Sequence, residues 1–249
     1  MEIGVQFYTI RDFCKTLDEF SESLKRVADI GYKNVQISGT CAYEAQWLKQ
    51  ELDKNDLRCV LTHTASDKLT GNLKSVITDH DILDCQYVGL GSFPFREENM
   101  NQGYRDYLRM YKPVTKALRE HGKYFMHHNH FQEYQKYNGI RILDLIAEEF
   151  SADELGFTLD TYWVQKAGAD PAQWLEKLSG RVPCIHLKDC SFNGDMAVVG
   201  EGNINFDRIF EKAAAAGTKY MLVEQDECYG EDPFLCLKRS YQNLKTMGF

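Results

Sequence analysis

With 249 residues the chain can bury a substantial core, and α/β barrels of this length commonly form one domain. Its 43% hydrophobic and 27% charged residues are typical of a globular protein, and no apolar run of about 18 residues indicates a membrane span. The net charge of −8 disfavours nucleic acid as a partner, because that binding depends on neutralising phosphates. A small-molecule ligand is therefore expected.

The N-terminus and the cysteines both bear on the location of the protein. The opening Met-Glu-Ile-Gly-Val lacks the basic region and long apolar run of a signal peptide. Eight cysteines are scattered without any CxxC pair, which indicates reduced thiols in the core. Both features predict a cytoplasmic protein.

Short apolar runs alternate with longer helical patterns along the chain, and eight such cycles can be counted. Several helical runs end at a glycine, as at Gly31, Gly122 and Gly217. The predicted strands are Ile3–Thr9, Asn34–Ser38, Arg58–His63, Tyr87–Leu90, Tyr124–His128, Gly156–Leu159, Val182–Leu187 and Lys219–Val223. The predicted helices are Leu17–Ile30, Glu44–Lys54, Lys68–Leu83, Tyr104–His121, Ile140–Phe150, one beginning near Asp170, Phe206–Ala216 and Pro233–Met247.

Eight βα units in a chain of this length predict an α/β fold, a (β/α)₈ TIM barrel. An open doubly wound sheet also alternates, but it more often has a glycine-rich phosphate turn after its first strand. Here the first turn, Tyr8–Arg11, contains no glycine, which favours the barrel. No linker-like or low-complexity segment interrupts the pattern, so we expect a single domain over 1–249.

Three of the seven histidines lie together at the end of the fifth predicted strand. Side chains on a strand alternate between its faces, so His128 and His130 share one face while His127 shares the other with Asn129. We expect His128 and His130 to point into the barrel mouth and His127 to pack against the helical layer.

Ligand-type side chains end each of the last four strands. They are His128, Asp160, His186 and Glu224, and consecutive members lie about one βα unit apart. Because a barrel carries its active site at the carboxyl ends of its strands, these four should converge on one mouth. Two imidazoles and two carboxylates suit one divalent transition metal, Mn²⁺, Zn²⁺ or Co²⁺, better than Ca²⁺ or Mg²⁺.

Residues next to these four extend the predicted site. Lys188 lies two residues after His186 and should face the mouth, where an ammonium could stabilise an oxyanion. The alternative for Lys188 is a surface ion pair with Asp189. Substrate contacts, each of which could equally be structural, are assigned to Arg11, Gln36, His63, Trp163, Glu201 and Asp226.

Six stretches spread over the chain carry a resemblance to a known family. They are Gly4–Arg11, His128–His130 with Glu133, Leu159–Trp163 with Ala167-Gly168, Gly180-Arg181 before His186–Asp189, Val199–Gly202, and Val223–Asp226. With them the chain resembles the sugar phosphate isomerase/epimerase family, the xylose isomerase-like TIM barrels. The resemblance implies a small-molecule sugar or sugar phosphate as substrate and one divalent metal held by residues of the last four strands.

The chain departs from this family at two places. Many epimerases carry a glutamate on strand five, which works with the strand-eight carboxylate as an acid/base pair, and this chain has His128 there. Gln36 likewise stands where related chains often place a glutamate. The His-Asn-His variant resembles members that act on oxidised sugars such as 3-keto-glycosides and inososes.

The resemblance implies enolisation of a keto-sugar, with Lys188 stabilising the enolate and Glu224 or His130 moving the proton. The alternative is a lyase or dehydratase that uses the same enolate for β-elimination on a 3-keto-sugar or inosose. A non-catalytic sugar-binding barrel and an apurinic/apyrimidinic endonuclease-like hydrolase are the less favoured options. The endonucleases carry a histidine where this chain has Trp163. A homo-oligomer is left open.

Overall fold

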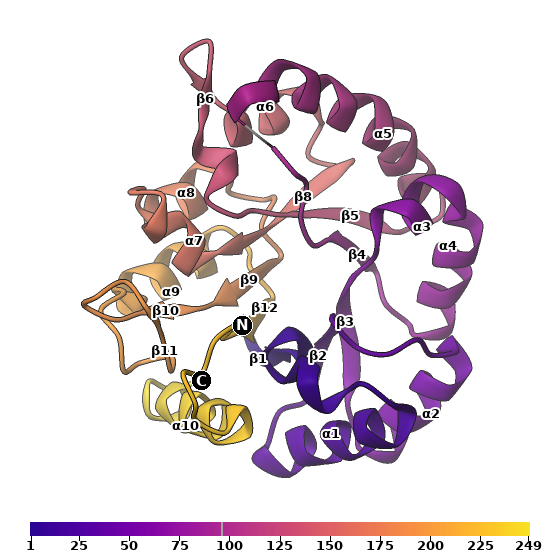
Figure 1. Cartoon of the computed structure of the whole chain (residues 1–249), viewed down its shortest axis with the longest axis vertical. Coiled ribbons are helices and arrows are strands. Elements are labelled where there is room, and N and C mark those ends of the chain that lie inside the picture. Colours follow the sequence, from indigo (N-terminus) through magenta and orange to yellow (C-terminus); the bar gives the residue numbers. More distant parts are fainter. Residues whose placement is uncertain (96) are drawn as a thin grey trace.

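The computed structural model describes residues 1–95 and 97–249, and its centre is a closed barrel of eight parallel strands. The strands follow one another around the barrel in the order β1-β12-β9-β8-β5-β4-β3-β2, with the helices as an outer ring (Figure 1). The predicted (β/α)₈ barrel is confirmed. The barrel strands are β1 (Glu2–Gln6), β2 (Asn34–Ile37), β3 (Arg58–His63), β4 (Tyr87–Leu90), β5 (Tyr124–His128), β8 (Leu155–Asp160), β9 (Cys184–Leu187) and β12 (Tyr220–Val223).

The outer elements include α-helices, short 3₁₀ helices and two small hairpins. The α-helices are α1 (Leu17–Ile30), α2 (Ala45–Lys54), α3 (Ser66–Gly71), α4 (Leu73–Ile82), α5 (Met100–Glu120), α6 (Ile142–Glu149), α7 (Thr161–Lys166), α8 (Pro171–Lys177), α9 (Phe206–Ala215) and α10 (Pro233–Thr246). The 3₁₀ helices are η1 (Phe7–Phe13), η2 (Glu97–Asn99) and η3 (Gln132–Tyr134). The hairpins pair β6 (Lys136–Tyr137) with β7 (Ile140–Arg141), and β10 (Asp189–Cys190) with β11 (Met196–Ala197).

Two predicted elements differ most from those observed, and one observed helix was not predicted. The first strand ends at Gln6, whose side chain accepts a hydrogen bond from the Tyr8 N–H and begins η1. The helix predicted over Lys68–Leu83 is broken at Asn72, which has φ −144° and ψ 50°. The short helix α7 was not predicted, because its six residues are too few to show a helical period directly after a strand.

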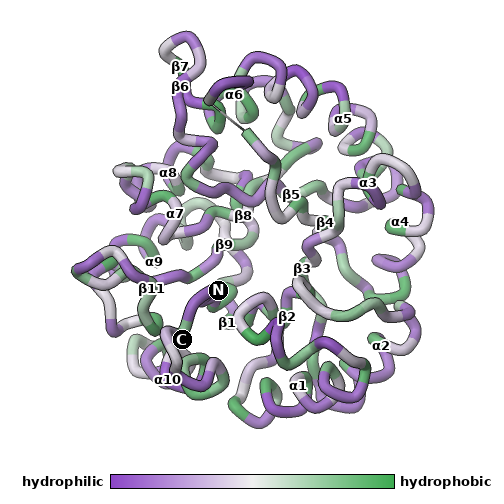
Figure 2. Tube along the Cα trace, in the orientation of Figure 1, coloured by the Kyte–Doolittle hydropathy of each residue, from purple (hydrophilic) through white to green (hydrophobic). Residues whose placement is uncertain are grey.

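The apolar core divides into a layer between strands and helices and a small cluster inside the barrel. Hydrophobic and hydrophilic stretches alternate along the outer helices, as expected when one face of each helix packs on the strands (Figure 2). The interior cluster consists of Val60, Leu61, Tyr87, Met126, Cys184 and Leu222. Gly156 makes room for it, since a Cβ there would lie 2.5 Å from the Tyr124 ring. Below the polar mouth the barrel is therefore filled.

Two further findings concern the cysteines and the helices. All eight cysteines are free thiols, and five of them are buried. Among the described residues, no helix combines the length and the apolar character needed to cross a membrane.

The buried His80 on α4 makes stability depend on pH. Its Nδ1 donates to the Val76 carbonyl at 2.7 Å, and its Nε2 lies 2.9 Å from Thr62 Oγ1. Burial lowers the pKa of His80 from 6.5 to about 4. The unfolded chain therefore binds more protons than the folded chain between these values. We expect the free energy of unfolding to fall, as the pH drops from 6.5 to 4, by roughly 3 kcal/mol from this residue.

Urea denaturation of the wild type and of His80→Gln across this pH range tests the expectation. The variant should lose this part of the pH dependence, whereas His121→Gln, a change at an exposed histidine, should keep it. Parallel curves for wild type and His80→Gln would contradict the assignment.

Candidate functional site

A cavity of about 630 Å³ opens at the carboxyl ends of the strands. This volume suits a small-molecule ligand. Its wall includes the histidines of β3 and β5 and the acidic and basic residues after β9 and β12. The lining residues are Tyr8, Ser38, His63, Thr64, Ala65, Ser66, Leu90, Gly91, Ser92, His128, His130, Trp163, Lys188, Glu224 and Asp226.

The four ligand-type residues meet at the base of this cavity. His128, Asp160 and His186 lie on the adjacent strands β5, β8 and β9, and Glu224 directly follows β12. All four are buried, and one ligand atom from each lies within 4.8 Å of the others. The structure thus brings together the set that the strand ends indicated.

Two hydrogen bonds leave each imidazole, in its neutral form, with a lone pair facing this cluster. The ring of His128 places Nδ1 2.8 Å from the Gly91 carbonyl, which can only accept. His186 Nε2 lies 2.7 Å from Gln36 Oε1. The remaining nitrogens, His128 Nε2 and His186 Nδ1, are 3.1 Å apart. Two lone pairs at this distance repel unless a proton or a metal ion lies at one of them, and two neutral imidazole nitrogens beside carboxylates are a donor set that fits a metal.

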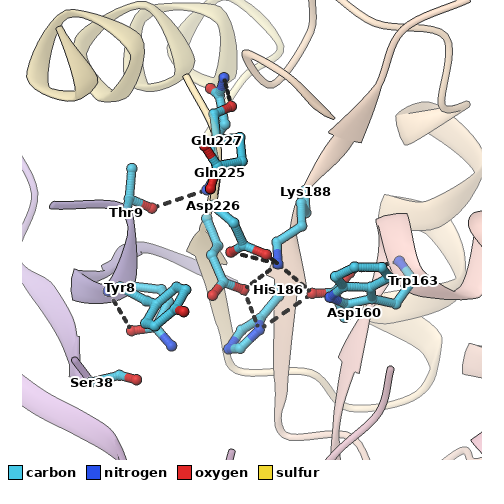
Figure 3. Close-up of polar contacts among 12 residues, drawn as sticks. Tyr8, Thr9, Ser38, Asp160, Trp163, His186, Lys188, Gln225, Asp226 and Glu227 are labelled. Carbon is cyan, nitrogen blue, oxygen red and sulfur yellow. Dashed lines mark hydrogen bonds and ion pairs between the residues drawn. The ribbon is translucent and has the colours of Figure 1, made fainter. Parts of the chain in front are cut away.

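Charge in the site points the same way. The Nζ of Lys188 lies 3.2 Å from Asp160 Oδ2 and 3.0 Å from both Glu224 Oε2 and Asp226 Oδ1. Figure 3 shows Lys188 reaching between Asp226 and Asp160. Although burial opposes charge on each group, the carboxylates raise the pKa of Lys188, and Lys188 holds the pKa of Asp160 well below its usual value. Three carboxylates face one ammonium, and a divalent cation would neutralise the excess.

Glu224 and His186 form a second ionic contact, with Oε2 and Nδ1 2.8 Å apart. Burial lowers the pKa of His186, but the neighbouring carboxylates outweigh it and raise the pKa to about 9. Without a metal, His186 therefore carries a proton on both ring nitrogens. A bound metal would replace the proton at Nδ1.

Asp160 serves both the cluster and the local fold. Its Oδ2 faces Lys188, while its Oδ1 accepts the backbone N–H of Trp163 at 2.9 Å and caps α7. This cap sets the indole of Trp163 at the cavity wall, 5.3 Å from the His130 ring. His130 in turn lies 4.6 Å from the His128 ring, and burial lowers its pKa to about 4.

Three predicted substrate contacts lie outside the cavity wall. Gln36 is buried and binds His186 instead. Arg11 donates from Nη1 to the Asp226 carbonyl at 2.8 Å and pairs with Glu227 at 3.2 Å, so it braces the loop after β12. The exposed Glu201 pairs with Arg239 on α10.

The orientation of Glu201 follows from Asp189. This buried carboxylate accepts the backbone N–H groups of Gly200 and Gly202, each at 2.9 Å, and so turns the side chain between them outward. The same bonds exclude the alternative reading of Lys188 as a surface partner of Asp189, since Lys188 is 1% exposed and faces the cluster. His63, Trp163 and Asp226 do line the cavity.

His127 lies on the other face of β5, as expected. Its Nδ1 is 2.9 Å from the Tyr107 hydroxyl of α5, and its Nε2 is 3.6 Å from the buried Glu133. Glu133 also accepts the backbone N–H of His130 at 2.9 Å. This buried network fixes the loop that carries His130.

Sequence reasoning missed several hydroxyl groups of the cavity wall. Ser38, Thr64 and Ser92 follow β2, β3 and β4, and Tyr8 follows β1. Their signal was the same position just past a strand, but hydroxyl residues are too common there to stand out beside histidines and carboxylates.

Comparison with solved structures shows the same fold at low identity. A sugar phosphate isomerase/epimerase from Parabacteroides distasonis ATCC 8503 has a TM-score of 0.84 at 22% identity, over 99% of this chain and 94% of that chain. An L-ribulose 3-epimerase gives 0.74 at 14% identity, over 100% and 99%. The probable 3-DHS dehydratase AsbF from Bacillus anthracis gives 0.71 at 15% identity, over 98% and 99%. No curated protein matches the sequence.

A family match covers most of the chain. The pattern of the xylose isomerase-like TIM barrels matches residues 24–234. This range includes all four ligand-type residues, His128, Asp160, His186 and Glu224. The resemblance found in the sequence is therefore confirmed, and the chain belongs to the family of xylose isomerase-like TIM barrels.

Proposed function

We propose that this protein is a divalent-metal-dependent sugar isomerase or epimerase that acts by enolisation of a keto-sugar. The observation that carries the proposal is the convergence of His128, Asp160, His186 and Glu224 beside Lys188, at the base of one cavity. The metal, held by the four ligand-type residues, would supply Lewis acidity that polarises the substrate carbonyl.

The chain's own groups supply the rest of the chemistry. Lys188, a buried cation, can donate a hydrogen bond to the carbonyl oxygen as negative charge develops there. Glu224 can remove the proton from the carbon next to the carbonyl, and His130 can return or remove one from the other side. Trp163 offers an aromatic face against which a sugar ring can pack.

A lyase that expels a leaving group by β-elimination is the second candidate. It is supported by Asp226, which lines the cavity within 3.0 Å of Lys188. Burial and the Glu224 carboxylate raise the pKa of Asp226 to about 7, against the opposing effect of Lys188. A carboxyl group with such a pKa can protonate a departing oxygen near neutral pH.

Incubation with a panel of keto-sugars and their phosphates in D₂O separates these candidates. An isomerase or epimerase places deuterium on the carbon next to the carbonyl of recovered sugar, and a lyase releases water or an aglycone. We expect Lys188→Met to lower the exchange rate by about 10² to 10³, as for loss of one oxyanion donor. Lys212→Met, at a surface ion pair on α9, is the control and should leave the rate unchanged. No exchange and no elimination across the panel would contradict the proposal.

Metal binding is tested by elemental analysis after dialysis against Mn²⁺, Zn²⁺ or Co²⁺. The wild type should retain about one ion per chain, and the double variant His186→Ala, Glu224→Ala should retain none, since each ligand lost weakens the site. The control replaces the same two residue types at exposed positions, His121→Ala with Glu201→Ala, and should keep the ion. Equal metal content in all three proteins would overturn the metal assignment.

A further inference from the structure

One cavity residue, His63 at the end of β3, has a protonation pattern that its neighbours fix. The Oε1 of Gln6 accepts the Tyr8 backbone N–H at 3.1 Å. This bond orients the amide, so that the Gln6 Nε2 faces His63 Nδ1 at 3.3 Å. An amide nitrogen can only donate a hydrogen bond. His63 Nδ1 must therefore accept, and the ring proton must lie on Nε2.

A second neighbour is consistent with this tautomer. The Ser38 hydroxyl lies 3.1 Å from the same Nδ1, and a hydroxyl can turn to donate. A proton on Nδ1 would meet the Gln6 amide hydrogens, as would a doubly protonated ring. The neutral ring with its proton on Nε2 is the form that satisfies both neighbours.

The Nε2–H of His63 then has nothing to bind. The atom is buried and has no hydrogen-bond partner among the described residues. A buried donor without a partner is destabilising, and in a native structure it calls for an explanation. The ring lines the cavity and lies against the ligand cluster, 5.1 Å from the His128 ring and 5.7 Å from the His186 ring. Since the ring lines the cavity, a substrate bound there would supply the missing acceptor.

We propose that His63 is a catalytic hydrogen-bond donor, held by Gln6 in the neutral Nε2–H form, which binds the oxygen of the keto-sugar that gains charge. This step rests on the proposed function. The C–H bond next to the carbonyl breaks and its proton passes to Glu224 or His130. The C–H electron pair forms the C=C bond, and the carbonyl π pair moves to the oxygen. His63 stabilises that charge without changing its own protonation, and Gln6 is a positioning residue.

The first experiment determines the tautomer of His63. It uses long-range ¹H–¹⁵N NMR of protein with ¹⁵N-labelled histidine, either metal-free or loaded with Zn²⁺. His63→Phe identifies the signal by its loss. We expect the wild-type ring to carry its proton on Nε2. Gln6→Glu should move the proton to Nδ1, because a carboxylate accepts, whereas Gln6→Met removes the donor without supplying an acceptor. A wild-type ring protonated on Nδ1 would overturn the proposal, and this reading needs no substrate.

The second experiment tests the donor role and uses the keto-sugar that exchanges fastest in D₂O. We expect His63→Phe and Gln6→Glu to lower kcat by about 10² to 10³ with little change in KM, and the keto-sugar to shift the His63 Nε2 signal. Unchanged kcat in His63→Phe would overturn the donor role.

If no keto-sugar exchanges, the proposed function fails, and D-fructose at saturating concentration then decides this inference alone. A shift of the Nε2 signal supports the donor, and an unchanged signal overturns it.

Discussion

The site depends on a balance of buried charge around one ammonium group. Lys188 lies within 3.2 Å of carboxylates on Asp160, Glu224 and Asp226, and water does not screen these contacts because Lys188 and the first two carboxylates are almost completely buried. Three carboxylates so close together would repel strongly without it, and their mutual repulsion is relieved further by each additional positive charge. The negative charge left over by three carboxylates around one ammonium makes the mouth attractive to a divalent cation.

The barrel allows this concentration of charge because it supplies rigid positions and backbone partners. Asp160 ends a buried strand and caps the helix that follows, so its two oxygens have separate tasks. The Asp189 carboxylate accepts hydrogen bonds from backbone N–H groups of the long loop after β9, including those of Gly200 and Gly202. A Cβ at Gly202 would lie 2.3 Å from the Asp189 carboxylate, which explains why this turn needs glycine. Loops held in this way keep the mouth open while Asp189 pairs with the backbone N–H groups of Gly200 and Gly202.

Neutral partners set the direction of three histidine rings in the site. The Gly91 carbonyl and the Gln36 amide oxygen both accept, so the neutral rings of His128 and His186 direct lone pairs inward. The Gln6 amide nitrogen donates, so His63 directs a proton inward. Imidazoles lying side by side thus present different groups to the site, because the atom behind each ring differs. A glutamate in place of Gln36 would accept from His186 with a full charge and add to an already negative site.

The sequence by itself determined the barrel and the four ligand-type positions, because parallel strands bury both faces and their ends align polar side chains on one mouth. It also separated His127 from His128, since side chains alternate on a strand. Only the tertiary structure decided that Arg11 and Glu201 turn away from the cavity and that Gln6 acts behind His63. Those outcomes depend on contacts between residues far apart in the chain, and no local period encodes which oxygen or nitrogen another strand will present.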